Sequence, residues 1–164
     1  MEADIADHVW TLEELQTSFS PAHCTQPKFI SLRANYDTFC AMSSDATTTL
    51  HDLKQLLKDF RDERAWAQFH DAKNLAEAIS IEASELLELF LWKTPRDVSK
   101  ALKSDRQLKK SVEEELADII CFSLNLANAI DIDVSRIVRK KISTNRKKYP
   151  VEKAKGTATK YNKL

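Results

Sequence analysis

Two segments of the chain combine an apolar helical face with acidic side chains at the spacing that a metal site requires. They are NLAEAISIEASELLELFLW, residues 74–92, and SVEEELADIICFSLNLANAI, residues 111–130. At about 100° per residue, each segment is predicted to form an amphipathic helix. Four acids form an E-x-x-E pair and an E-x-x-D pair on or beside the apolar faces: Glu82, Glu85, Glu115 and Asp118.

The position of each acid relative to the predicted apolar face indicates how far it is expected to be buried. The face of the first helix consists of Leu75, Ile79, Leu86 and Phe90, with Glu82 in its middle and Glu85 at its edge. The face of the second helix consists of Val112, Leu116, Ile119, Ser123, Leu126 and Ile130, with Glu115 inside it and Asp118 at its rim. Other glutamates of these helices are predicted to point to solvent.

A divalent cation explains four inward acids better than structural pairing does. An unpaired buried carboxylate costs several kcal/mol, which a cation would offset for all four together. Oxygen ligands without His or Cys favour Mg²⁺, or Mn²⁺, over zinc. Di-iron carboxylate bundles are a neighbouring possibility, but they place His three residues after Glu on the same helix. Here that position is Glu85 or Asp118.

The composition predicts an all-α protein. The chain has 164 residues, a single glycine, Gly156, and long runs rich in Ala, Glu, Lys, Leu and Arg. This length suits one domain with an ordinary core, and one glycine excludes Gly-rich phosphate loops. Four main helices, two with charge on the inner face, give one protomer a thin core. We therefore expect a homo-oligomer, a dimer or a tetramer.

Charge and cysteine content limit the other function classes. Lys plus Arg and Asp plus Glu both number 25, so the net charge gives no argument for a nucleic-acid or membrane partner. Residues 136–164 are basic, which suits a polyanionic ligand, although a solvated tail explains them equally well. The three cysteines, Cys24, Cys40 and Cys121, lack metal-ligand spacing and are expected to be reduced. Without a signal peptide or an apolar run of membrane length, a cytoplasmic location is expected.

The chain is predicted to divide into three parts: an N-terminal extension over 1–45, a catalytic domain over 46–150 and a basic tail over 151–164. The extension lacks a sustained period, and Met42 precedes a run of helix-capping residues. One hypothesis is that Met42 is a natural start and that the residues before it are an appended leader.

Within the catalytic domain, helices are predicted over about 48–64, 74–92, 95–103 and 105–130, followed by a last one that Asp133 caps and Pro150 ends. Thr94 and Pro95 form the start of the short third helix.

Four stretches of the sequence resemble the MazG-like, all-α nucleoside triphosphate pyrophosphohydrolases, and within them the dCTP pyrophosphatase subgroup. They are RDERAWAQFH (61–70), KNLAEAISIEASELLELFLWK (73–93), EEELADII (113–120) and KISTNRKKYP (141–150). The two acid pairs in this order are a fairly specific signature, whereas either pair alone would be weak. The resemblance implies a MazG-like helical bundle that cleaves between the α- and β-phosphates of a nucleoside triphosphate, giving the monophosphate and pyrophosphate.

The resemblance also implies roles for individual residues. The Mg²⁺ ligands would be Glu82, Glu85, Glu115 and Asp118. Trp66 and Trp92 match the aromatic residues that flank the base in dCTP-specific members. A dCTP or related pyrimidine substrate is therefore expected.

Further substrate contacts follow from the same resemblance. Asn145 matches an Asn that contacts substrate, and Arg146 and Lys148 fall in the basic segment expected near the phosphates. Phe122 departs from the family pattern, because relatives often have Tyr there, and fine substrate choice is left open. His70 is a candidate acid or substrate contact, although a loop histidine beside aromatic residues is more often a packing residue.

The chemistry of the residues agrees with hydrolysis by direct attack of water. No Ser, Cys or His is arranged for covalent catalysis, and a divalent cation neutralises a triphosphate and lowers the pKa of water that it binds. Glu82 or Glu85 is expected to serve also as the base. Two alternatives stay open: a hydrolase of another phosphate compound, and a non-catalytic helical oligomerisation module that leaves the inward acids as an unrelieved cost.

Overall fold

Helices make up most of the described part of the chain. The computed structural model describes residues 43–163, and none of these lies in a strand. The helices are α3 (Leu50–Glu63), α4 (Ala72–Glu88), α5 (Pro95–Ser104), α6 (Arg106–Ala129), α7 (Val134–Lys148) and the single turn α8 (Val151–Ala154). Two 3₁₀ turns, η1 (Trp66–Phe69) and η2 (Tyr161–Lys163), complete the elements. The prediction of an all-α chain with four main helices is confirmed.

The chain forms two compact units, Met1–Ser44 and Asp45–Leu164, and nearly all of the first lies outside the described residues. The hypothesis of a start at Met42 therefore stays a prediction, and Cys24 and Cys40 also fall outside the described part. In the described part, no helix has the length and apolar character needed to cross a membrane.

Side-chain caps fix where the helices begin. Thr49 accepts a hydrogen bond from the Asp52 amide at 3.2 Å, and the Asp52 carboxylate accepts one from the Thr49 amide at 2.8 Å. Thr94 caps α5 with Pro95 in its first turn, as predicted. The N-caps of α4, α6 and α7 are aspartates: Asp71, Asp105 and Asp133. Each satisfies amides that a helix start leaves without partners.

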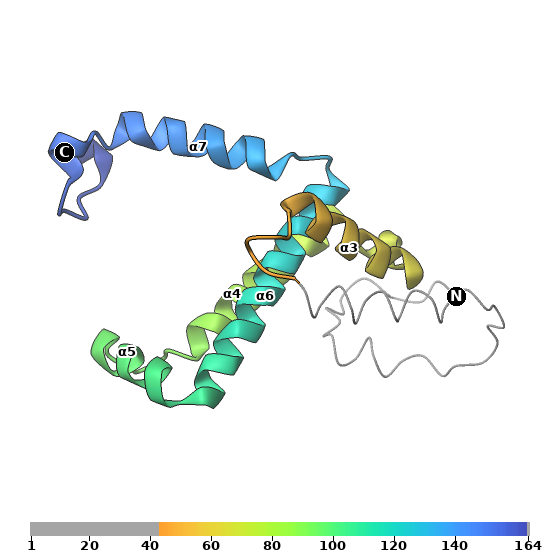
Figure 1. Ribbon diagram of the computed structural model, residues 1–164, viewed down its shortest axis with the longest axis horizontal. Coiled ribbons are helices and arrows are strands. Elements are labelled where there is room, and N and C mark those ends of the chain that lie inside the picture. Colours follow the sequence, from red (N-terminus) through yellow and green to blue (C-terminus); the bar gives the residue numbers. More distant parts are fainter. Residues whose placement is uncertain (1–42, 164) are drawn as a thin grey trace, which may run out of the picture. The chain divides into compact units, whose positions relative to one another are not determined.

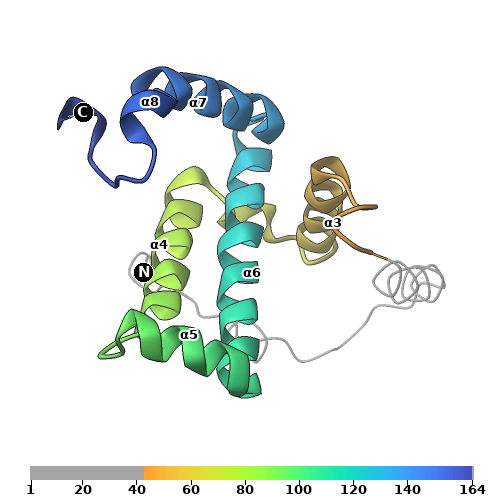
Figure 2. The same ribbon diagram turned by 60° about the vertical axis from the view of Figure 1, so that its left-hand side comes forward.

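Helices α4 and α6 are the packed centre of the described chain. They run antiparallel side by side, joined by α5 at one end (Figures 1 and 2). The deepest side chains lie on these two helices: Leu75 is 2% exposed, Leu124 5% and Ala127 6%. Helix α3 packs on the opposite side of α6, and α5 covers its start.

The predicted apolar face of the second acidic helix is partly wrong. Leu116 is 47% exposed and Ile130 48%, and Ser123 is also exposed. The buried positions of α6 are instead Leu124, Asn125 and Ala127. Periodicity alone identifies an apolar stripe but not which side of it faces the neighbouring helix in one chain.

The first acidic helix also ends earlier than predicted. Helix α4 stops at Glu88, and in the turns that follow the amides of Phe90, Leu91 and Lys93 each donate to the carbonyl three residues back. Trp92 has a left-handed φ of +62°, which a non-glycine residue adopts only at some cost in energy. The aromatic ring therefore stands on a turn and not on the helix.

Helix α7 follows the α6 turn but packs extensively against none of the described elements. Its apolar side chains are about half exposed: Ile137 at 46%, Val138 at 47% and Ile142 at 48%. The helix contains no acidic residue, whereas its last turn holds Arg146, Lys147 and Lys148. One protomer therefore leaves an apolar face of a basic helix uncovered.

Candidate active site

Three of the four predicted acids meet between α4 and α6. Glu82, Glu115 and Asp118 each offer a carboxylate oxygen, and these oxygens lie within 4.8 Å of one another. Glu115 and Asp118 are three residues apart on α6, so helix geometry places them on adjacent turns of one face. All three side chains are half-buried. In the described part of the chain, this is the group of acids that could hold a metal ion.

Burial and, after it, crowding of negative charge shift the acids toward their neutral forms. Burial, together with the charges of Asp118, Glu85 and Glu115 and a hydrogen bond with Glu115, raises the pKa of Glu82 to about 7. Burial first and the Glu85 charge second raise the pKa of Glu115. Like charges at close range disfavour ionisation of each other. A cation between them would reverse that effect.

The pKa of Asp118 is also raised, in part by an acid that points to solvent. Burial and then the charge of Glu114 raise the pKa of the Asp118 carboxyl. Glu114 itself points outward, as predicted, and lies 3.2 Å from the Lys110 ammonium. Glu114 thus adds negative charge near the site although it points outward. A simple division of the acids into an inward and an outward set does not account for this contribution.

Glu85 stands beside this group without joining it. It lies one turn after Glu82 on α4, and its side chain is exposed. Its charge nevertheless reaches both Glu82 and Glu115. The geometry thus separates a tight group of three carboxylates from a fourth at its solvent edge.

The donor set fits a hard divalent cation. All nearby donors are carboxylate oxygens, which Mg²⁺ and Mn²⁺ prefer, and neither His nor Cys belongs to the group. Among residues 43–163, no Lys or Arg forms an ion pair with Glu82, Glu115 or Asp118. Repulsion among the acids is the cost that metal binding would relieve.

An aromatic cluster lies just before α4. The Trp66 ring packs edge-on against Phe60, with centroids 5.8 Å apart, and tilts against His70 at 6.4 Å. The Arg64 guanidinium lies 3.6 Å from the centre of the Phe60 ring, a cation–π contact. Phe60 was not among the residues singled out from the sequence. The F-x-x-x-R spacing on one helical face was the available signal for this contact.

His70 is half-buried with an unused polar atom. No hydrogen-bond partner for its buried Nδ1 is found among the described residues. Burial and, secondarily, the charge of Arg61 lower the pKa of the imidazole. A neutral ring with a free nitrogen can donate or accept a hydrogen bond to a ligand, so His70 remains a candidate substrate contact.

The remaining predicted substrate residues are spread over three elements. Trp92 is 95% exposed, and Phe122 is half-buried one turn after Asp118 on α6. Asn145 is half-buried near the end of α7, and the Lys148 ammonium lies 4.8 Å from the centre of the Tyr161 ring. Arg146 and Lys148 are two residues apart, which is a rotation of about 200° around the helix axis, so their side chains point to different sides of α7. Phe122 thus lies beside the acids, whereas α7, which carries Asn145 and Lys148, packs extensively against neither α4 nor α6.

Sequence comparison places these features in a family. The profile of the MazG-like family matches residues 78–164, which include all four acids. A dCTP pyrophosphatase 1 from Bos taurus is 38% identical over 122 residues, which cover 74% of this chain and 72% of the relative. The dCTP pyrophosphatase 1 from Homo sapiens is 36% identical over 116 residues, covering 71% and 68%.

Comparison with solved structures agrees. The crystal structure of a pyrophosphatase from Archaeoglobus fulgidus matches with a TM-score of 0.55 and 30% identity, covering 79% of this chain and 99% of that one. The proteins named here are all pyrophosphatases, which confirms the expectation of an enzyme. The chain belongs to the MazG-like family.

Proposed function

We propose that the protein is a Mg²⁺-dependent nucleoside triphosphate pyrophosphohydrolase that acts on dCTP or a related pyrimidine deoxynucleotide. The products are the monophosphate and pyrophosphate. The observation that carries the proposal is the convergence of Glu82, Glu115 and Asp118 within 4.8 Å in a chain whose relatives are named dCTP pyrophosphatases.

The acids divide into two roles. Glu82, Glu115 and Asp118 hold the cation, Mg²⁺ or in its place Mn²⁺, and Glu85 completes the ligand set from the solvent edge. When bound, the cation supplies charge neutralisation for the triphosphate and a water of lowered pKa. Glu85 is also favoured over Glu82 as the base, because its exposed carboxylate lies outside the tight group and can reach an attacking water.

The aromatic residues bind the base and α7 binds the phosphates. Trp66 and Trp92 provide stacking surfaces, and His70, with its free Nδ1, offers a polar contact. Phe122 bounds the site one turn beyond Asp118. On α7, Asn145 shares the apolar face, and Lys148 and Arg146 provide positive charge at the end of the helix.

A second copy completes the site. The α7 face with Ile137 and Ile142 is about half exposed, and the surface at the end of α4 is more exposed still, with Leu87 at 67% and Trp92 at 95%. Apolar patches of this kind mark association surfaces. We propose a homo-oligomer, a dimer or tetramer, in which α7 of one protomer reaches the acids of another.

The other features of the proposal concern the whole chain. Residues 46–150 form the catalytic domain, flanked by the extension over 1–45 and the basic tail over 151–164. The protein is cytoplasmic and acts on a free nucleotide, with neither nucleic acid nor membrane as a partner. Nucleotide pool sanitation, the removal of unwanted deoxynucleotides, is the corresponding role.

Pyrophosphate release from a panel of ribo- and deoxynucleoside triphosphates, with and without Mg²⁺, tests the proposal. Mg²⁺-dependent release that is fastest with dCTP or another pyrimidine supports it, and Asp118→Asn serves as the inactive control. Turnover only of other phosphate compounds would reassign the substrate. No turnover of any compound, in a protein that is folded and oligomeric, would indicate an interaction module.

A further inference from the structure

A polar pocket of about 270 Å³ lies away from the acids, between α3 and the end of α6. Its lining consists of His51, Lys54, Gln55, Lys58, Arg61, Asn128 and Asp131. Asn128 comes ten residues after Asp118, which is about 15 Å farther along α6. The pocket is therefore a place separate from the candidate active site, and nothing in the proposed reaction uses it.

The cations of the pocket lie on one face of α3. His51, Lys54, Lys58 and Arg61 follow one another at spacings of three or four residues, which bring side chains together on a helix. Lys54 and Lys58 repel each other at this spacing. The lining supplies three fixed cations against one acid, Asp131, so its net charge is positive.

Two of the basic groups are unused. Neither the Lys58 ammonium nor the His51 ring has a hydrogen-bond or ion-pair partner among residues 43–163. Arg61 is held by Asp62, with Nη2 2.6 Å from the carboxylate, and its side chain is 15% exposed. The pocket thus has free positive charge at its mouth beside an anchored guanidinium.

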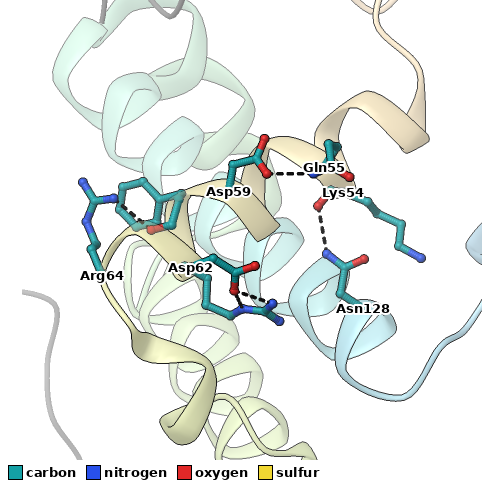
Figure 3. A network of polar contacts seen from close by, with 8 residues as sticks. Lys54, Gln55, Asp59, Asp62, Arg64 and Asn128 are labelled. Carbon is teal, nitrogen blue, oxygen red and sulfur yellow. Dashed lines mark hydrogen bonds and ion pairs between the residues drawn. The ribbon is translucent and has the colours of Figure 1, made fainter. Parts of the chain in front are cut away.

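Hydrogen bonds between α3 and the end of α6 and its following turn stabilise the pocket. The Asn128 amide donates to the Lys54 carbonyl at 2.9 Å (Figure 3). The Lys54 ammonium donates to the Ile132 carbonyl at 2.8 Å, which leaves two of its N–H groups available. The turn that contains Asp131 is closed by the Ile132 amide, which donates to the Ala127 carbonyl at 2.8 Å. A preformed site costs a ligand less than one that must be assembled.

We infer that this pocket binds a small phosphate-bearing anion. Lys58, Lys54 and His51 provide donors for its oxygens, whereas the Asp131 carboxylate opposes an anion by its negative charge. The volume lies just below the range of about 300–1,000 Å³ typical of drug-sized ligands. Orthophosphate and pyrophosphate both fit within this volume, and their charge is complementary to that of the lining. An anion here lies against the turn that leads to α7.

Titration of the full chain, followed by nuclear magnetic resonance, tests the site. Sodium orthophosphate and pyrophosphate are added in excess EDTA, which removes metal from the acids, and the His51 ring and Asn128 amide signals are followed. Saturable shifts at both residues are expected. Higher affinity for pyrophosphate assigns a diphosphate site, and equal affinity assigns a single phosphate group.

Three variants separate the site from general charge effects. Lys58→Gln should weaken binding by about tenfold or more, because it removes a charge-assisted hydrogen bond. Asp131→Asn should tighten binding, because it removes the opposing charge. Lys100→Gln, an exposed lysine of α5, should change nothing. Shifts that chloride reproduces at equal ionic strength, or an unchanged affinity in both pocket variants, would overturn the inference.

Discussion

The α4–α6 pair and α7 differ in how much of their apolar surface is buried within one chain. The pair buries Leu75, Leu124 and Ala127 and brings three carboxylates together within a single protomer. Helix α7 has a comparable length to α4 but leaves Ile137, Val138 and Ile142 about half exposed. It also carries seven cations and no acid: Arg136, Arg139, Lys140, Lys141, Arg146, Lys147 and Lys148.

The proposed division of labour between chains rests on this difference. The proposed metal ligands need only the helix pair and can be built by one chain. The proposed phosphate contacts stand on a helix whose apolar face is about half exposed in one chain. We therefore expect changes in the pair to abolish chemistry, and changes in α7 to act through assembly and substrate binding.

The largest expected effect is at the acids. Glu85→Gln or Asp118→Asn should lower Mg²⁺-dependent turnover by at least about a hundredfold, because even residues that only orient metal ligands contribute 10- to 100-fold. Helical content should be unchanged, since neither substitution removes volume. Pyrophosphate release and circular dichroism measure the two effects. Glu88→Gln, an outward acid of α4, is the matched control. Full activity in either variant would contradict the assignment.

The outcome for the helix pair shows what sequence periodicity can predict. The existence of the helices, their caps at Thr94 and Asp133 and the meeting of Glu82, Glu115 and Asp118 all follow from local rules of spacing and capping. These depend on residues near one another in sequence or on one antiparallel pairing.

The features that sequence missed depend on long-range packing. The exposed side of α6, with Leu116 and Ile130, could not be identified because an apolar stripe does not specify which neighbour covers it. The end of α4 at Glu88 depends on turns before Trp92 in which a non-glycine residue takes a left-handed φ. Strain of this kind is maintained by tertiary context.

The second effect concerns the two tryptophans. Stacking on a base contributes about 1–3 kcal/mol, so Trp66→Ala or Trp92→Ala should raise KM for the preferred nucleotide by roughly 5- to 150-fold. Trp66 is half-buried against Phe60, so its removal should also lower the melting temperature. Measuring KM for pyrimidine and purine substrates beside melting separates these roles. An unselective loss for all bases would reject base recognition.

The third effect concerns the uncovered face of α7. Ile142→Glu should dissociate the oligomer and lower activity by about tenfold, as expected for loss of about 1.4 kcal/mol of binding. Ser143→Glu adds the same charge about 100° around the helix, away from the apolar residues, and is the control. Light scattering gives the oligomeric state. An Ile142→Glu protein with unchanged mass and activity would show that α7 needs no partner.

The smallest effect is a pH dependence of stability in the metal-free protein. The pKa of Glu82 is raised from 4.5 to about 7, so the folded state keeps a proton that the unfolded state releases. The contribution of Glu82 to stability is therefore fully present below about pH 4.5 and is lost as the pH rises toward 7. Glu82→Gln should make this loss of stability with rising pH smaller, and added Mg²⁺ should oppose the loss as well. Thermal unfolding in EDTA across this range measures it, and a melting temperature that rises equally in both proteins would contradict the cause.

Mixing two inactive variants tests the division of labour most directly. Asp118→Asn lacks a metal ligand but has an intact α7, whereas Asn145→Ala has intact acids but lacks a proposed substrate contact. If α7 of one protomer completes the acids of another, co-refolded mixtures will form some sites with both parts intact and recover turnover. Native mass spectrometry confirms that mixed oligomers are present. Mixed oligomers that remain as inactive as the two parents would contradict a site shared between chains.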